Sequence, residues 1–242
     1  RPGHVAATAA LALRQRREVG RAMGDSSLLA ALASGDALSP GLGAGCDERV
    51  VEYAWLLAQR PAGRVLDAGS TLNHPHVLKR FLPRFDGLTI ATLAPERRAF
   101  TRRGVAYVYA DLRDLPFRDD WFDAVVCAST LEHVGLDNAH YGAAGTASDD
   151  PATQARSALA ELRRVLRPSG TLLLTVPYGR PENFGWLRCF GERDVAAVLD
   201  WWGADESAVS VFAFTPAGWE RSSLDASRDA RYHDPISNPQ RG

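Results

Sequence analysis

Short apolar runs alternate with longer stretches of helical spacing through the middle of the chain. The runs are rich in Val, Ile, Leu and aromatic residues, which is typical of buried β-strands. Strands that alternate with helices at this distance predict βαβ units, a parallel sheet and right-handed crossovers. We expect strands at 64–67, 88–93, 105–109, 122–127 and 171–176, the last buried on both faces, and helices at 75–82, from 94–96 onward and at 153–166.

Residues 1–60 carry helical patterns instead. Ala, Leu and Arg dominate from His4 to about Met23 and predict a first helix. Residues 24–27 end that helix and supply the N-cap of another helical turn or two over 28–33. Residues 47–59 place apolar side chains on one face of a further helix. We expect a helical cap over residues 1–60, which either packs on the sheet as a layer or forms a lid over an active site.

The pattern changes again after Pro177. Residues 184–190 are aromatic and polar, residues 192–202 predict a helix, and the alternation from Val209 to Phe214 predicts a sixth strand. No seventh strand is evident from the pattern. We assign residues 61–242 to one α/β domain.

Composition narrows the partners of such a domain. The chain has 242 residues, of which 45% are hydrophobic and 24% charged, and its net charge is −1. This balance predicts no broad attraction to nucleic acid or to anionic lipid, and no apolar run approaches the ~20 residues of a membrane span. Cys46, Cys127 and Cys189 are few and far apart, which favours a reducing compartment and hence a cytoplasmic protein.

Polar residues follow the predicted strands at the points where they end. In an open α/β sheet, ligands bind beyond the carboxyl ends of the strands. The candidates are Asp67, Gly69, Ser70 and Asn73 after the first strand, Thr92 after the second, Asp111 after the third, Ser129–His133 after the fourth and Pro177–Gly179 after the fifth.

Four segments in this order resemble a class I S-adenosylmethionine-dependent methyltransferase. They are residues 65–69 (VLDAG), 109–117 (YADLRDLPF), 122–126 (FDAVV) and 162–172 (LRRVLRPSGTL), and Leu131–Val134 also matches a tetrapeptide common after the fourth strand. The resemblance implies a Rossmann-like fold with helices on both faces of the sheet, S-adenosylmethionine as cofactor and a small-molecule acceptor. The wider pattern, with residues 70–74 and 133–138, resembles a bacterial subgroup linked to glycan or secondary-metabolite pathways.

The resemblance also assigns cofactor-binding roles. Gly69 lets the backbone approach the methionine part, Asp67 organises the turn and the cofactor's amino group, and Asp111 accepts from the adenine amino group beside Leu112. From the residues alone, Asp67 could instead cap the following turn, and Asp111 could instead be an Asx-turn acid. The full predicted set is Asp67, Ala68, Gly69, Ser70, Asn73, Thr92, Leu93, Asp111, Leu112, Ala128 and Ser129.

Two departures from the family pattern concern this set. The family turn carries Gly-x-Gly-x-Gly, but Thr71 and Asn73 stand at its second and third glycine positions. The family places an acid at the end of the second strand to hold both ribose hydroxyls, and this chain has Thr92 there. Glu96 could reach back to the ribose, although we expect it in the first turn of a helix. A dinucleotide-binding site fits worse, because it needs G-x-G-x-x-G and an acid about 20 residues on.

Methyl transfer to a hydroxyl or amine requires alignment and, where needed, a base. We predict His133 as that base and Glu132 as its neighbour, while the alternative for His133 is a helix-capping role. Glu132, His133, Asp137 and His140 form a cluster that could hold a divalent cation, but the spacing is not diagnostic and we predict no metal site.

Two polar segments lie where an acceptor would bind, at about 135–152 and 178–192. Aromatic and arginine side chains in the second suit stacking on a sugar or a small aromatic molecule. The candidates there are Tyr178, Arg180, Asn183, Trp186 and Arg188. The sequence predicts a methyltransferase of small molecules, with a degenerate fold that binds without catalysis as the alternative.

Overall fold

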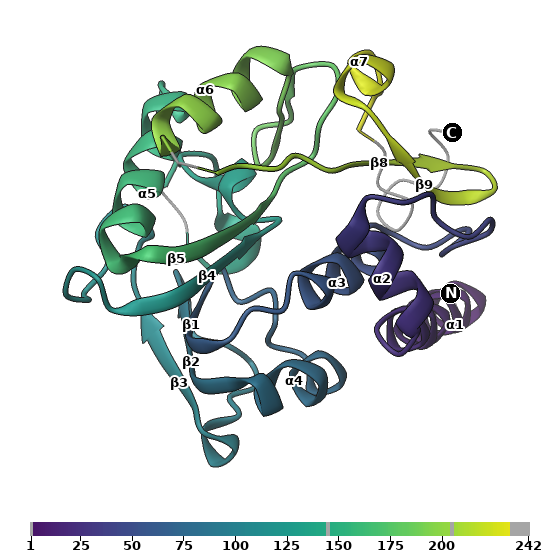
Figure 1. Cartoon of the computed structure of the whole chain (residues 1–242), viewed down its shortest axis with the longest axis horizontal. Helices are drawn as coiled ribbons and strands as arrows, with labels where there is room; N and C mark the ends of the chain where they lie inside the picture. Colours follow the sequence, from purple (N-terminus) through teal and green to yellow (C-terminus); the bar gives the residue numbers. More distant parts are fainter. Residues whose placement is uncertain (1, 144–145, 204–205, 233–242) are drawn as a thin grey trace. The chain divides into compact units, whose positions relative to one another are not determined.

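The computed structural model describes residues 2–143, 146–203 and 206–232, which form two compact units. One unit comprises residues 61–208 with 228–232, and the other comprises residues 1–60 with 209–227. The first unit contains a five-stranded parallel sheet of order β3-β2-β1-β4-β5 (Figure 1). Its strands are β1 (Gly63–Ala68), β2 (Phe85–Thr92), β3 (Val105–Tyr109), β4 (Phe122–Ala128) and β5 (Leu166–Thr175). This confirms the predicted Rossmann-like architecture.

Helices connect these strands where the periodicity predicted them. Helix α4 (Pro75–Phe81) follows β1, α5 (Pro151–Val165) precedes β5, and α6 (Glu192–Trp202) comes later. Proline stands at the first position of α4 and of α5, where its missing N–H costs nothing. The Asp150 side chain caps α5 by accepting from the N–H of Thr153 at 3.1 Å.

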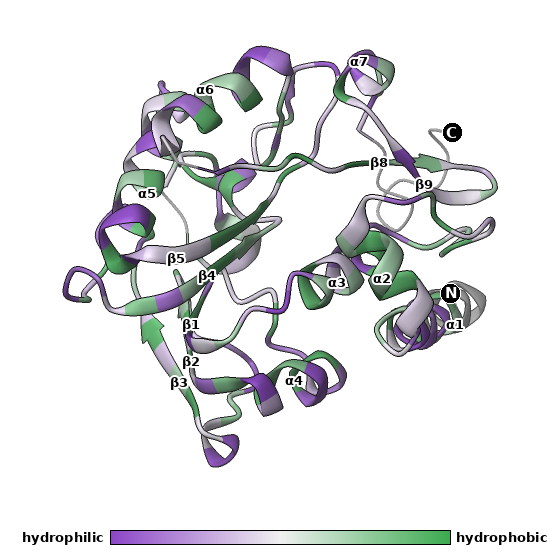
Figure 2. Ribbon diagram, in the orientation of Figure 1, coloured by the Kyte–Doolittle hydropathy of each residue, from purple (hydrophilic) through white to green (hydrophobic). Residues whose placement is uncertain are grey.

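The core of this unit joins one face of the sheet to α5 and α6. Its buried members come from alternate positions of the central strands and from the apolar side of α5, and Figure 2 shows the hydrophobic residues along β4 and β5. Strand order runs one way from β1 to β3 and the other way from β4 to β5, so right-handed crossovers place α4 on the opposite face from α5 (Figure 1). The main core residues are Leu66, Val125, Cys127, Leu131, Leu159, Leu162 and Phe190.

The predicted helix from 94–96 is wrong. Residues 93–100 have no helical structure, and the crossover from β2 to β3 contains a single 3₁₀ turn, Thr101–Arg103. The carbonyl of Arg98 and the N–H of Phe100 are bound by side chains from other elements, Asn73 and Tyr107. Backbone groups held in this way are not available for a helix ladder.

The burial predicted for the fifth strand is also wrong. Within 171–176 only Leu173 is buried, and the neighbouring residues are half-buried or exposed. The reason is the position of β5, which pairs with β4 alone and lies at the end of the strand order. Residues 168–170 lie inside β5, where its register with β4 shifts between Phe122 and Ala124.

The second unit consists of helices and a hairpin. Helices α1 (Pro2–Ala22), α2 (Ser26–Ser34) and α3 (Arg49–Ala58) confirm the helical patterns of the first sixty residues. The Asp25 side chain caps α2, accepting from the N–H groups of Ser27 and Leu28. The expected sixth strand is β8 (Val211–Thr215), but it does not pair with the described parallel sheet. It pairs antiparallel with β9 (Gly218–Ser222), a strand that the sequence did not predict. A short helix, α7 (Leu224–Ser227), follows.

The hairpin belongs to this unit through contacts with the loop before α3. The Trp219 indole N–H donates to the Cys46 carbonyl at 3.1 Å, and the Trp219 N–H donates to Leu42 at 2.7 Å. Gly218 has φ +125°, and a Cβ there would lie 2.5 Å from the Leu42 carbonyl. The domain limits 1–60 and 61–242, and the helical cap, stay predictions. None of the described helices is long and apolar enough to cross a membrane.

Candidate active site

The turn after β1 is organised by a buried carboxylate. Asp67 is 0% exposed, and its two oxygens accept from the N–H groups of Thr71 at 3.2 Å and Leu72 at 2.8 Å. A carboxylate that accepts two backbone hydrogen bonds compensates part of the cost of burying its charge. The structure therefore gives Asp67 the capping role that we considered as an alternative, and its contact with a cofactor stays a prediction.

The fold itself requires a glycine at residue 69, whether or not a cofactor binds there. Its φ is +116°, and a Cβ at this position would overlap the side chain of Thr130. Thr130 follows β4, so the turn after β1 and the segment after β4 are in contact at Gly69 and Thr130. This contact leaves no space for a side chain at residue 69. Thr130 therefore occupies the space where a side chain at residue 69 would lie, and the contact of Gly69 with a cofactor stays a prediction.

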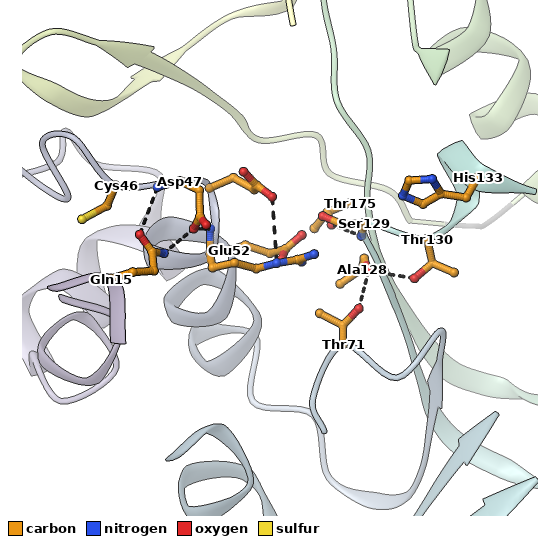
Figure 3. Close-up of polar contacts among 12 residues, drawn as sticks. Gln15, Cys46, Asp47, Glu52, Thr71, Ala128, Ser129, Thr130, His133 and Thr175 are labelled. Atoms are coloured by element: carbon orange, nitrogen blue, oxygen red, sulfur yellow. Dashed lines mark hydrogen bonds and ion pairs between the residues drawn. The ribbon is translucent and has the colours of Figure 1, made fainter. Parts of the chain in front are cut away.

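Thr71, at the second glycine position of the family turn, ties this turn to the neighbouring strand. Its hydroxyl donates to the carbonyl of Ala128 at 2.6 Å, and the Thr130 hydroxyl donates to the same oxygen at 2.9 Å (Figure 3). The N–H of Ser129 donates to both oxygens of Thr175 on β5. The ends of β1, β4 and β5 are therefore joined by hydrogen bonds.

Asn73, at the third glycine position, ties the turn to the β2–β3 crossover. Its amide donates to the Arg98 carbonyl at 3.1 Å and accepts from the Tyr107 hydroxyl at 2.8 Å. The Tyr107 hydroxyl in turn accepts from the N–H of Phe100 at 2.9 Å. Sequence reasoning missed Tyr107, although a tyrosine in the middle of an apolar strand signals a hydroxyl that needs a partner.

Three polar groups at this edge have no hydrogen bond to any described residue. They are the Ser70 hydroxyl, which is buried in the turn after β1, the half-buried Thr92 hydroxyl at the end of β2, and the half-buried carboxylate of Glu96. Buried polar atoms rarely remain without a partner. Ser70 also has φ +67°, a conformation that costs energy for a residue other than glycine. These groups fit a polar ligand with hydroxyl and amino groups, as S-adenosylmethionine is.

Asp111 is engaged by its neighbour. Its carboxylate accepts from the N–H of Arg113 at 2.9 Å, as in an Asx-turn, and from the Arg113 guanidinium at 2.6 Å and 2.9 Å. Burial raises the pKa of this carboxyl, but the hydrogen bonds from Arg113 outweigh burial and the net pKa is lowered. Leu112 is buried in the core and Leu93 is 37% exposed. The adenine-binding roles of Asp111 and Leu112 stay predictions.

His133 lies in the 3₁₀ turn Leu131–His133 that follows β4, and the segment after β5 fixes its ring. Nδ1 lies 2.7 Å from the Trp186 carbonyl, and the ring stacks on the Trp186 indole with centroids 5.4 Å apart. A carbonyl oxygen only accepts, so Nδ1 carries the proton and Nε2 carries the lone pair of the neutral ring. Nε2 faces the Tyr141 hydroxyl at 3.4 Å. The structure therefore brings the predicted Trp186 beside His133, and the role of His133 as a base stays a prediction.

Glu132 points into the protein. It is 2% exposed, and its charge acts on Cys127, Cys189 and Arg188. Burial lowers the pKa of the Arg188 guanidinium, and the carboxylates of Asp194 and Glu132 raise it. Arg188 also lies over the Phe190 ring, 4.2 Å from its centroid. Glu132 and Arg188 therefore have buried places in the fold, and their predicted roles in catalysis and acceptor binding stay predictions.

The loop after His133 is anchored by a buried asparagine. The Asn138 amide donates to the carbonyls of His133 and Leu136 and lies 3.0 Å from the Thr146 hydroxyl. Asp137 caps the turn Ala139–Tyr141, and the His140 side chain lies outside the described residues. No group of three metal-ligating side chains comes together in the described part of the chain.

The other predicted residues lie at strand ends, where they are buried or half-buried, or in the segment after β5. Ala68 and Ala128 are fully buried at the ends of β1 and β4, and Ser129 has φ +43°. Arg180 and Asn183 are exposed, and Asn183 accepts from the N–H of Gly185 at 2.8 Å. A hollow lined by Pro116, Phe117, Arg118 and Trp121 lies before β4, at the opposite end of that strand from Ser129.

Comparison with known proteins supports the family. Residues 69–174 match the family model described as a methyltransferase domain. Among solved structures, the 1,6-didemethyltoxoflavin-N1-methyltransferase of Burkholderia thailandensis is 22% identical, with 71% of this chain and 72% of that chain covered and a TM-score of 0.49. The YcgJ protein of Bacillus subtilis is 18% identical, with 66% and 70% covered and a TM-score of 0.49.

Both TM-scores lie below 0.5 and both identities below 25%, so these neighbours carry no information about the substrate. The similarity lies in residues 69–174 and is accompanied by the parallel sheet order β3-β2-β1-β4-β5. Through these residues, the chain is similar to the class I S-adenosylmethionine-dependent methyltransferases.

Proposed function

We propose that the protein transfers a methyl group from S-adenosylmethionine to a hydroxyl or amine of a small molecule, such as a sugar or natural product. The observation that carries this proposal is the geometry of His133, whose Nδ1 is bound to the Trp186 carbonyl at 2.7 Å so that Nε2 keeps the lone pair. His133 lies at the carboxyl end of β4, beside the turn after β1. Ligands of open α/β sheets bind at this edge.

The residues of the chain would divide the reaction between them. When bound, S-adenosylmethionine supplies an electrophilic methyl group on a sulfonium sulfur. Nε2 of His133 would accept the proton of the acceptor O–H or N–H. The Tyr141 hydroxyl, on a side chain 51% exposed, marks the direction from which an acceptor hydroxyl reaches Nε2.

Aromatic side chains around His133 support an acceptor with an apolar face. The ring of Tyr141 meets His133 edge-on at 5.2 Å, and Trp186 stacks on the other side at 5.4 Å. Aromatic rings pack against sugar faces and against planar rings. The three cysteines are free and buried, which supports a reducing compartment, and we propose a cytoplasmic location.

A second candidate function is binding without catalysis. It is favoured by the turn after β1, where Thr71 and Asn73 replace glycines and use their side chains for contacts within the protein. Thr130 also fills space beside Gly69. A turn closed in this way supports a protein that has kept the fold and lost the cofactor.

Titration of the protein with S-adenosylhomocysteine in a calorimeter separates the two. We expect a dissociation constant in the micromolar range, and absence of heat at millimolar ligand would overturn the proposed function. Transfer of labelled methyl from S-adenosylmethionine to a panel of hydroxyl and amine acceptors is the second step. Turnover with any acceptor would exclude the non-catalytic alternative.

A further inference from the structure

The loop that follows His133 brings the phenol of Tyr141 to the imidazole ring. The Tyr141 hydroxyl lies 3.4 Å from Nε2 of His133, and the tyrosine ring meets the imidazole edge-on with centroids 5.2 Å apart. Tyr141 is 51% exposed, and a hydrogen bond that water can replace adds little to stability. The structure therefore holds a phenolic hydroxyl at Nε2 in a contact that another hydroxyl can take over.

A buried side chain, that of Asn138, sets the place of Tyr141. Asn138 is 4% exposed, and its amide donates to the carbonyls of His133 at 3.1 Å and Leu136 at 2.9 Å. The backbone carbonyl of Asn138 accepts from the N–H of Tyr141 at 2.9 Å. One buried residue thereby ties the backbone of His133 to the backbone of Tyr141, so the approach of the phenol to the imidazole is built into the fold.

The turn at residues 184–187 fixes the imidazole from another side. Two successive carbonyls of this turn accept from the loop after β4, that of Gly185 from the N–H of Asp137 at 3.0 Å and that of Trp186 from Nδ1 of His133 at 2.7 Å. The Trp186 indole stacks on the imidazole with 22° between the ring planes. The surroundings of Nε2 are therefore rich in aromatic rings, which pack well against a flat apolar molecule.

Polar side chains of these two segments are engaged within the fold. The Thr146 hydroxyl donates to a backbone carbonyl at 2.7 Å and lies 3.0 Å from the Asn138 amide. Asp137 and Asn183 each accept from the backbone N–H two residues further along the chain, at 2.9 Å and 2.8 Å. A sugar presents several hydroxyls that each need a partner, whereas an aromatic ring with one hydroxyl needs only Nε2. These contacts favour the aromatic acceptor over the sugar.

Acidity favours the same class of acceptor, because a phenol gives its proton to a neutral imidazole far more readily than an aliphatic alcohol does. We propose that the acceptor carries its reactive hydroxyl on a planar aromatic ring, and that this hydroxyl takes the place of the Tyr141 hydroxyl at Nε2 of His133. The inference rests on the proposed function, because it takes His133 as the base of that reaction. In this assignment Asn138 and Trp186 are positioning residues, and the Tyr141 hydroxyl leaves Nε2 when the acceptor binds.

A pair of probes tests this assignment by binding alone. The compounds 2-naphthol and decahydro-2-naphthol share a carbon skeleton, and only the first carries its hydroxyl on a planar aromatic ring. Both dissociation constants are measured by calorimetry on the protein saturated with S-adenosylhomocysteine. We expect 2-naphthol to bind about 10-fold more tightly than its saturated analogue. Equal binding, tighter binding of the saturated alcohol or no binding of 2-naphthol would overturn the inference.

Variants of the two rings show whether the hydroxyls exchange at Nε2. Tyr141→Phe keeps the ring and removes the hydroxyl that meets Nε2, so it should tighten the binding of 2-naphthol about 2- to 10-fold. This gain should vanish in the background of His133→Leu, which has no Nε2 to compete for. Tyr232→Phe removes the hydroxyl of a tyrosine whose ring contacts Phe184, and as the matched control it should leave the dissociation constant within about twofold. Unchanged or weaker binding in Tyr141→Phe would contradict the exchange.

Transfer of labelled methyl from S-adenosylmethionine completes the test. We expect transfer to 2-naphthol and catechol, and transfer at least about 10-fold slower to decahydro-2-naphthol and cyclohexane-1,2-diol. If the protein binds S-adenosylhomocysteine but prefers the alcohols, or methylates none of the four compounds, the inference alone is overturned. Absence of S-adenosylhomocysteine binding would instead overturn the proposed function, so the two failures are distinct.

Discussion

The turn after β1 and the segment after β4 leave neighbouring parallel strands at the same edge of the sheet, and each contains a serine at positive φ. The turn after β1 has its own buried acceptor, because Asp67 accepts from N–H groups four and five residues further along the chain, and Thr71 and Asn73 add bonds to other elements. The segment after β4 depends on distant residues. The N–H of Ser129 binds Thr175, and the His133 ring binds the Trp186 carbonyl, 53 residues away.

From this difference we expect variants of the two segments to affect different quantities, the free energy of unfolding in one and the reaction rate in the other. A change within the turn after β1 breaks buried hydrogen bonds of the fold and is expected to appear in the free energy of unfolding. A change at His133 removes a half-buried ring whose contacts include the Trp186 carbonyl and two aromatic rings, and it is expected to appear in the rate. The predictions below test this separation.

The largest expected effect is on methyl transfer. His133→Gln should lower the rate by about 10²- to 10⁴-fold, the range expected for a general base, with the dissociation constant of S-adenosylhomocysteine within about twofold of wild type. Steady-state kinetics and calorimetry measure the two. His76→Gln, in the first turn of α4, is the matched control and should change neither. An unchanged rate in His133→Gln would remove His133 as the base.

The next effect is on stability. Asp67→Ala leaves the buried N–H groups of Thr71 and Leu72 without their acceptor, which should lower the free energy of unfolding by about 2–4 kcal/mol. Urea denaturation followed by circular dichroism measures it. Asp86→Ala, an exposed acid on β2, is expected to stay within about 0.5 kcal/mol of wild type. A loss below about 1 kcal/mol in Asp67→Ala would mean that the turn is not closed by this carboxylate.

A smaller effect should follow from the contact between the two turns. Thr71→Val keeps the side-chain shape and removes the hydroxyl that donates to the Ala128 carbonyl, at an expected cost of about 1 kcal/mol in unfolding free energy. The Ala128 oxygen keeps its bond from Thr130, so it is not left without a donor. The double variant Thr71→Val/Thr130→Val should therefore lose more than the sum of the single losses. Simple additivity, measured by urea denaturation, would argue against a shared acceptor.

The smallest effect concerns pH. Hydrogen bonds from Arg113 outweigh burial and hold the pKa of the Asp111 carboxyl below its ordinary value of 3.8. The ionised carboxylate therefore contributes stability that is fully present above pH 3.8 and is lost as pH falls through the lower pKa of the folded protein. The stability difference between wild type and Asp111→Asn should be constant from pH 7 to 5 and should shrink below pH 4. A difference that grows in acid would contradict this sign.

Much of the fold followed from periodicity and from a few capping residues. All five strands of the sheet begin or end within a few residues of their predicted positions, and α4 begins at Pro75 as expected. The helix from 94–96 failed because Asn73 and Tyr107 take the backbone groups of 98 and 100. The fifth strand failed because a strand's exposure depends on its place in the sheet, and β5 pairs on one side only.

The sequence predicted which residues lie at the edge of the sheet where ligands bind. It did not predict which residues their side chains contact. Asp67 and His133 could be chosen because the ends of parallel strands meet at one edge. Thr130 and Tyr107 acquire their importance only from neighbours that the fold brings close. Thr71 and Asn73 were recognised as departures from glycine, but their partners were not.

By itself, the sequence determined the α/β class, the order of strands and helices, and the edge of the sheet where polar groups collect. These depend on apolar spacing, helix caps and strand-end residues, which act over a few positions. Only the tertiary structure decided which hydrogen-bond partners those polar groups have. Asn73 meets Arg98 across 25 positions, Thr71 meets Ala128 across 57, and His133 meets Trp186 across 53. Such pairs form because the packing of strands brings distant backbone carbonyls beside a side chain, and local sequence does not encode that packing.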